Sequence, residues 1–272
     1  MRLAVVLMAV LALFWLGYEF FRLLWQPSQI GSYQVLPGAI DLNQRYEEVH
    51  YWFAGKPVYG HLRIASYPPA SYVILWPLLG WLGVTPAIWL WAVTTVVVLG
   101  WLIYIVVRES GASTPLEHTF IALIPLSMYA TGATIGNGQL IIHLLPMLLT
   151  GLLLLRQRQY GWREDILAGV LILVTLVKPS VSAPFCWLVI FVPRRLRPIL
   201  LVICGYVVMT LFAALFQKSG VLSLLHNWIA RGTEISTKAA VTLSHSNLHS
   251  WLAALGLEQW NSLASLTTLV IL

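Results

Sequence analysis

Long apolar runs separated by short polar connections occupy most of the chain. The first run extends from Leu3 to about Leu24, and a later one covers Pro86–Val107. About 20 apolar residues in a helix cross a hydrocarbon layer of about 30 Å, and the runs lack the alternation of transmembrane β-strands. Helices satisfy their own backbone hydrogen bonds in lipid. The pattern therefore predicts membrane helices in these two runs and at Thr119–Ile135, Gln139–Leu155, Ile166–Val177, Ala183–Val192, Ile199–Phe216 and Leu263–Leu272.

Two polar segments interrupt this pattern, at Trp25–Ser71 and at Gln217–Ser250. The apolar stretch that follows the first, Tyr72–Gly83, has only about a dozen residues, too few to cross a bilayer as a helix. We expect this stretch to dip into the outer interface without crossing. The two polar regions are then outer loops, at about 25–85 and about 217–250, of a single membrane domain that covers residues 1–272.

The composition agrees with a membrane protein. Of the 272 residues, 59% are hydrophobic and 10% are charged, whereas soluble domains carry about 25% charged residues. The fold class predicted is an all-α, polytopic integral membrane protein. The net charge of +6 does not indicate a nucleic-acid partner, because in a membrane protein the position of the basic residues carries the information.

The basic residues predict the orientation of the chain. If each long run crosses once, one face receives eight of the sixteen Lys and Arg residues in short connections, where the positive-inside rule applies. We therefore expect the N-terminus to be cytoplasmic, in the cell (inner) membrane. The opposite, outer face receives Asp41, the turn Gly136–Gln139, Lys178 and the second polar segment. The eight inner basic residues are Arg2, Arg108, Arg156, Arg158, Arg163, Arg194, Arg195 and Arg197.

Two charges are candidates for chemistry, and each also has a structural interpretation. Lys178 separates two short apolar runs, where an unpaired ammonium is costly. It either faces a cavity or extends to the interface. Asp41 is either a reactive carboxylate, a solvated carboxylate of the loop, or the N-cap of a helix that begins at Leu42. Glu47 and Glu48 follow at helical spacing, as a solvated face or as alternative acids.

Several motifs together resemble the first outer loop and later motifs of a known enzyme family. They are Asp41–Glu48, Gly55–Tyr59, Tyr67-Pro68-Pro69, Gly138-Gln139, Leu176–Pro179 with Pro184-Phe185, His226–Trp228 and Ser246–Leu248. With its motifs in this order, the chain resembles family GT87, a family of the GT-C superfamily of membrane glycosyltransferases. Members of family GT87 use polyprenyl-phosphate-mannose as the donor. Members of that family continue for several more helices, so the resemblance implies a domain that is incomplete at the C-terminus.

The resemblance implies a hexosyltransferase, with mannose as the expected sugar. Its partners are a polyprenyl-phosphate-sugar donor, a lipid or glycan acceptor, and membrane lipids. Asp41 occupies the position of the family's catalytic aspartate, and Lys178 is expected to bind the donor phosphate. Further substrate contacts are expected from Gln139, Asn137, Asn247, Arg231 and Tyr67. No metal and no cofactor is predicted.

Two functions of other classes stay open on the sequence. A transporter or flippase for a polar or lipid-linked substrate would place functional charges in the middle of its helices, whereas those seen here lie near helix ends. A non-catalytic membrane subunit is the second alternative. No nucleotide-binding motif of the Walker or dinucleotide type occurs, which argues against an ATP-driven pump.

Overall fold

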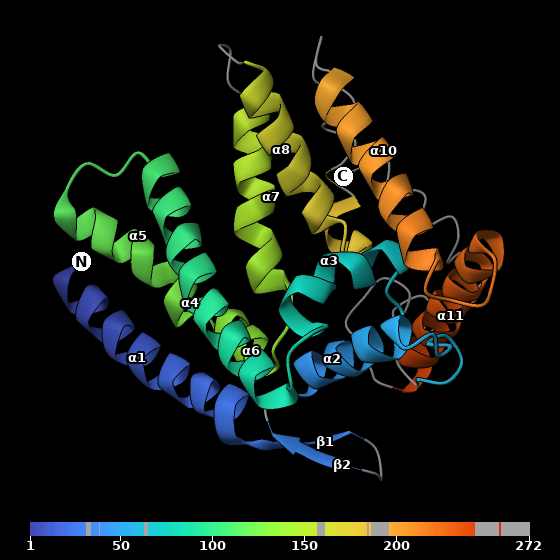
Figure 1. Ribbon diagram of the computed structural model, residues 1–272. Helices are drawn as coiled ribbons and strands as arrows, with labels where there is room; N and C mark the ends of the chain where they lie inside the picture. The colour runs from blue at the N-terminus through green and yellow to red at the C-terminus, as the bar shows by residue number, and fades with distance from the viewer. Residues whose placement is uncertain are drawn as a thin grey trace.

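The chain folds into a set of helices with one short β-hairpin (Figure 1). The computed structural model describes residues 1–30, 34–37, 39–62, 65–156, 161–183, 185, 196–242 and 256. The hairpin consists of β1 (Pro27–Ile30) and β2 (Gln34–Pro37), which pair antiparallel, and the sequence analysis did not predict it. The helices are α1 (Arg2–Trp25), α2 (Ile40–Phe53), α3 (Pro69–Leu79), α4 (Val84–Glu109), α5 (Pro115–Ser127), α6 (Tyr129–Gly136), α7 (Ile141–Arg156), α8 (Trp162–Thr175), α10 (Leu196–Ala214) and α11 (Val221–Thr242).

Several helices are suited to a bilayer. In the described part of the chain α1, α4 and α10 are each long and apolar enough to cross a membrane, and α5 with α6 forms one further, bent candidate. These helices expose large apolar side chains, among them Phe14 on α1, Val97 on α4 and Val208 on α10. Exposed apolar surface on this scale requires a lipid or protein partner. The prediction of an all-α membrane protein is confirmed.

One predicted helix is broken in two. The run Thr119–Ile135 divides at Met128, whose backbone is extended, and α5 and α6 meet there at a bend of 51°. Pro125, three residues earlier, cannot donate a backbone hydrogen bond and weakens the end of α5. Beyond the break, α6 lies very close to α1, because a Cβ atom at Gly132 would be 1.9 Å from Nε1 of Trp15.

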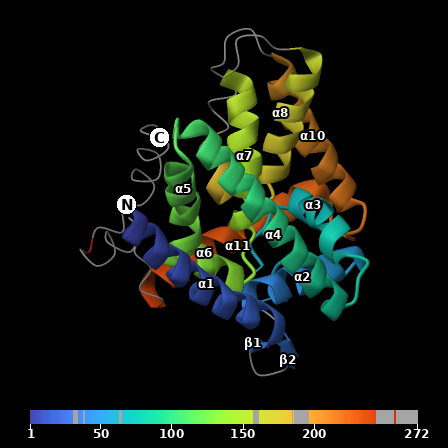
Figure 2. The same ribbon diagram turned by 90° about the vertical axis from the view of Figure 1, so that its left-hand side faces the viewer.

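The helices define two ends of the molecule. The connections after α1, α6, α8 and α10 all lie near α2, at the lower end in Figure 1, here called the α2 end. The other end carries Arg108, Arg156, Arg163 and Arg197 and is here called the arginine end. Figure 2 shows the same separation from the side, with α2 and the hairpin below and the tops of α7 and α8 above. This grouping of segments is the one that the sequence predicted.

Helix α3 begins and ends at the α2 end. At its start, the Ser71 hydroxyl donates a 2.7 Å hydrogen bond to the carbonyl oxygen of Val177, beside Lys178. After its end, the carbonyl of Leu82 accepts a hydrogen bond from the hydroxyl of Tyr46 on α2. A helix of 11 residues spans only about 16 Å. With both ends at the α2 end, it is too short to reach the arginine end.

The polar segments are more ordered than loops. Trp52 of α2 is buried and donates from Nε1 to the carbonyl of Ala213, and Gln217 donates to the carbonyl of Trp52. The second polar segment, predicted as a loop, contains the helix α11. Trp228 of α11 donates to the carbonyl of Ser66, so this helix packs against the first polar segment. The predicted run Leu263–Leu272 and most of Ala183–Val192 lie outside the described residues.

Candidate functional site

Helix α2 presents Asp41 at the α2 end of the molecule. The helix begins at Ile40 with Ala39 as its N-cap, and no side chain caps it. The interpretation of Asp41 as an N-cap is therefore wrong. Its carboxylate is half-buried in the first turn, where the helix dipole favours a negative charge. The carboxylate is not used as a cap of this helix.

A buried ion pair lies on the same face of α2. Arg45 donates from Nη1 to Oε2 of Glu48 over 2.7 Å, and both side chains are buried. The guanidinium also stacks 4.2 Å above the ring centre of Tyr67. The interpretation of Glu48 as part of a solvated face is wrong. Because both partners of Arg45 are fixed, this cation has a defined position in the site.

Burial changes the acidity of this cluster. Burial raises the pKa of Glu48 from its ordinary value of 4.5 to about 7, although Arg45 acts in the opposite direction. Burial likewise raises the pKa of the Tyr67 hydroxyl to about 12, again against the effect of Arg45. Tyr67 is therefore a neutral hydrogen-bonding group at physiological pH. A carboxyl group with a pKa close to 7 is typical of functional sites.

Lys178 follows the end of α8 in a turn that is fixed to α3. Its backbone N–H donates to the carbonyl of Thr175, and its own carbonyl accepts from the N–H of Val181. The hydrogen bond from Ser71 to Val177 attaches the preceding residue to α3. The ammonium group is half-buried and forms no ion pair with another described residue. An ammonium in this setting is suited to an anionic ligand.

The structure brings Asp41 and Lys178 together. Burial lowers the pKa of Lys178, the carboxylate of Asp41 opposes this shift, and the positive charge of Arg45 adds to it. Asp41 also acts electrostatically on Arg45. The three charges thus share one site, although Asp41 and Lys178 do not form a direct ion pair.

The turn before α7 supports the site. Asn137 accepts a hydrogen bond on Oδ1 from Arg22 over 3.0 Å, and Arg22 also pairs with buried Glu19 at 2.7 Å. The Asn137 oxygen therefore has a structural partner within the fold. Gly138 packs directly on Leu42.

The remaining predicted site residues have different surroundings. The half-buried Gln139 follows this turn, with its backbone N–H bonded to Thr134. Arg231 forms an ion pair with Glu234 on α11 and reaches the carbonyl of Leu62 at 3.5 Å. Asn247 lies outside the described residues.

Arg45 was not among the site residues predicted from the sequence. Asp41, Arg45 and Glu48 are spaced i, i+4 and i+7, and this spacing places them on one face of a helix. That spacing was the available signal. What it could not reveal was the burial of Arg45 and Glu48 under segments distant in the sequence.

A comparison with protein families decides the class of the protein. Residues 66–272 match Glycosyltransferase family 87. The chain belongs to this family. It is therefore a glycosyltransferase, with a sugar donor and an acceptor as its substrates. The matched residues include Tyr67, Gln139 and Lys178, whereas Asp41 precedes them. No curated protein and no solved structure matches this family 87 chain.

Proposed function

We propose that this family 87 glycosyltransferase transfers a hexosyl group, specifically mannosyl, from a polyprenyl-phosphate donor to a lipid or glycan acceptor. The observation that carries the proposal is the electrostatic coupling of Asp41, Arg45 and Lys178 at one end of a membrane helix bundle. A donor of this kind keeps its prenyl chain in hydrocarbon and its phosphate at the headgroup level. Asp41 and Lys178 lie at helix ends, where that phosphate would be.

The proposed reaction assigns a role to each charge. The acceptor hydroxyl oxygen forms a bond to C1 of the sugar, and the bond from C1 to the donor phosphate oxygen breaks. The hydroxyl proton passes to the carboxylate of Asp41, which acts as general base. Lys178 stabilises the charge on the departing polyprenyl phosphate, and Arg45, fixed by Glu48 and Tyr67, adds positive potential.

The depth of Lys178 supports a lipid-linked donor. Helix α8 has 14 residues and spans only about 21 Å, less than the thickness of the hydrocarbon layer. Since the arginine end satisfies the positive-inside rule, we assign it to the cytoplasm and the site to the extracytoplasmic face. The N-terminus is then cytoplasmic, and the inner membrane is the proposed location.

Transfer by the purified chain tests this proposal. Proteoliposomes containing the protein and labelled polyprenyl-phosphate-mannose are supplied with candidate lipid and glycan acceptors, and labelled product is measured. We expect wild-type protein to form labelled product and Asp41→Asn to form none, while Glu47→Gln retains activity. Glu47 is the matched control because it is a half-buried carboxylate on the same helix.

Other outcomes would contradict the proposal in distinct ways. Movement of intact donor across the membrane without product would identify a transporter or flippase. Neither product nor movement would indicate a non-catalytic subunit. Wild-type turnover in Asp41→Asn would remove Asp41 from the mechanism while leaving transfer itself established.

A further inference from the structure

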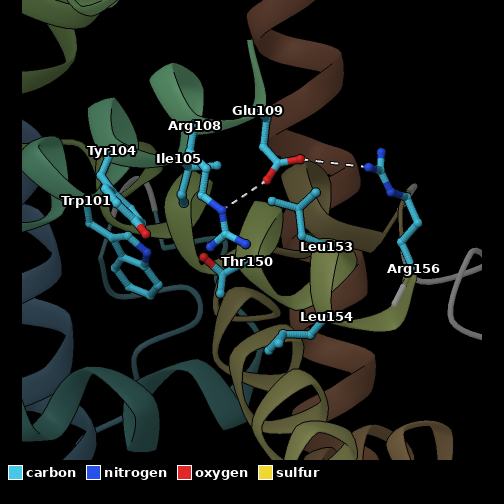
Figure 3. Close-up of a pocket in the computed structure, with 9 residues that line it drawn as sticks. All are labelled: Trp101, Tyr104, Ile105, Arg108, Glu109, Thr150, Leu153, Leu154 and Arg156. Carbon is cyan, nitrogen blue, oxygen red and sulfur yellow. Dashed lines mark ion pairs between the residues drawn. The ribbon is translucent and has the colours of Figure 1, made fainter. Parts of the chain in front are cut away.

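A cavity of about 370 Å³ lies at the arginine end, between α4 and α7. It is distinct from the site of Asp41 and Lys178, because α4 has 26 residues and so separates the two ends by about 39 Å. Figure 3 shows the side chains around it. Its lining consists of Trp101, Tyr104, Ile105, Arg108, Glu109, Thr150, Leu153, Leu154 and Arg156.

One wall of the cavity supplies hydrogen-bond donors. Figure 3 shows the guanidinium of Arg108 directed toward the hydroxyl of Thr150. The Thr150 oxygen is buried and has no hydrogen-bond partner in the described part of the chain. A helical threonine commonly satisfies its hydroxyl on a preceding backbone carbonyl. A buried hydroxyl without a partner is costly, so this group fits a ligand oxygen.

The charges at the cavity favour an anion. The Glu109 carboxylate lies between the two arginines, at 3.6 Å from Nε of Arg108 and 3.8 Å from Nη2 of Arg156. Charge-assisted hydrogen bonds are shorter, at about 2.7–2.9 Å. Two guanidinium groups therefore share one carboxylate through long contacts. The three side chains together keep a net positive charge. An incoming phosphate can pair with Arg108 without first breaking a close ion pair.

Three aliphatic side chains form an apolar wall of the cavity. These side chains are Ile105, Leu153 and Leu154, and Tyr104, a residue that is 60% exposed, lines the cavity as well. A soluble phosphate compound would gain nothing from these groups, whereas the first part of an acyl chain would be buried against them. Basic pockets between membrane helices are typical binding sites for acidic lipid head groups.

We propose that this cavity binds an anionic phospholipid of the inner leaflet. The phosphate lies between Arg108 and Thr150, and the acyl chains follow the wall formed by Ile105, Leu153 and Leu154. The phenol of Tyr104 and the indole of Trp101 are further donors at the headgroup level. The site is separate from sugar transfer and does not require it.

Lipid binding by the purified full chain tests the proposal. The protein is prepared in detergent, titrated with phosphatidylglycerol, and the bound fraction is measured by native mass spectrometry. We expect Arg108→Gln to weaken binding about tenfold, since a charged hydrogen bond is lost. Thr150→Val, which keeps the shape of the side chain, should weaken it several-fold. Arg163→Gln should bind as wild type, because Arg163 is exposed at the same end without lining the cavity.

Three results would overturn the proposal. The first is equal binding of phosphatidylcholine, which would show that the negative charge is not recognised. The second is equal affinity for soluble glycerol phosphate, which would show that the apolar wall contributes nothing. The third is an equal loss of binding in Arg163→Gln and Arg108→Gln, which would indicate a general surface effect. If Arg108→Gln does not elute as a folded protein, the comparison of Thr150→Val with wild type decides.

Discussion

The backbone N–H of Asp41 donates a hydrogen bond to the carbonyl oxygen of Asn137, over 3.0 Å. This bond joins the first turn of α2, which carries the proposed base, to the turn that precedes α7. The next residue, Gly138, has a positive φ of 67° and allows the two backbones to meet. The position of Asp41 therefore depends on a glycine that is distant in the sequence.

Gly138→Ala is expected to destabilise the protein and to reduce transfer. An added Cβ would lie 2.6 Å from Cβ of Leu42 and 3.0 Å from Cβ of Ala39. The left-handed backbone costs about 1–2 kcal/mol for a residue with a side chain, and overpacking adds about 1–3 kcal/mol. Thermal unfolding in detergent and the transfer assay measure both effects.

Gly111→Ala is the matched control for this prediction. Gly111 has a similar φ of 69°, but nothing lies within 4 Å of an added Cβ. The Gly111→Ala variant should lose only the stability that the left-handed backbone costs, and it should keep its transfer activity. Equal losses of stability in the two variants would contradict the proposed contact between Gly138 and α2.

Removal of Arg22 is expected to destabilise the protein more than removal of both members of its ion pair. Glu19 is completely buried, and Arg22 joins it to Asn137. Arg22→Met leaves the Glu19 carboxylate without its cation, at a cost of about 3 kcal/mol. In the double variant Glu19→Gln with Arg22→Met, no uncompensated charge stays buried. The unfolding temperatures of the two variants test this order of stabilities. A lower unfolding temperature for the double variant than for Arg22→Met would contradict it.

The long helices could be predicted from the sequence because their apolar runs are themselves long enough to span a membrane. The division of Thr119–Ile135 into α5 and α6 could not. It depends on tertiary contacts such as the stacking of Trp15 on Tyr129, with ring centres 5.3 Å apart, and on the close approach of α1 to Gly132. Pro125 is a local signal for a weak point in this run, but it does not by itself specify that the chain bends at Met128.

The site was predictable in part for a similar reason. Lys178 stands out in the sequence because it interrupts apolar residues, and Asp41 stands out through the family resemblance. Arg45 and Glu48 have the spacing of an exposed helical pair, yet both are buried. Tyr67, which covers Arg45, comes from a separate segment of the chain. Burial of this kind is a property of the assembled structure.

Lys178→Ala is expected to raise the KM for the donor by about tenfold, the loss of one charged hydrogen bond to phosphate. Lys178→Arg keeps the positive charge and should recover part of the affinity. Lys56→Ala is the control, because Lys56 is an exposed lysine of the first polar segment that contacts Tyr51. Initial rates at varied donor concentration provide the measurement. An unchanged KM in Lys178→Ala would show that Lys178 only extends to the interface.

Stability should fall as the pH rises, because of Glu48. Burial raises the pKa of this carboxyl from 4.5 to about 7 in the folded protein. Between these two values the unfolded chain has lost the proton while the folded protein keeps it. Protons bind more to the folded state in this range, so raising the pH favours unfolding. This shift in pKa corresponds to a decrease in the free energy of unfolding on the order of 3 kcal/mol across that pH range.

Glu48→Gln should remove this pH dependence. Its amide has no proton to lose, so the unfolding temperature should vary less between about pH 5 and about pH 8 than that of the wild type. Glu47→Gln keeps the buried carboxyl and should keep the slope. Thermal unfolding in the same detergent at each pH measures all three proteins. A wild-type slope in Glu48→Gln would mean that Glu48 is already ionised throughout this range, with Arg45 compensating the cost of its burial.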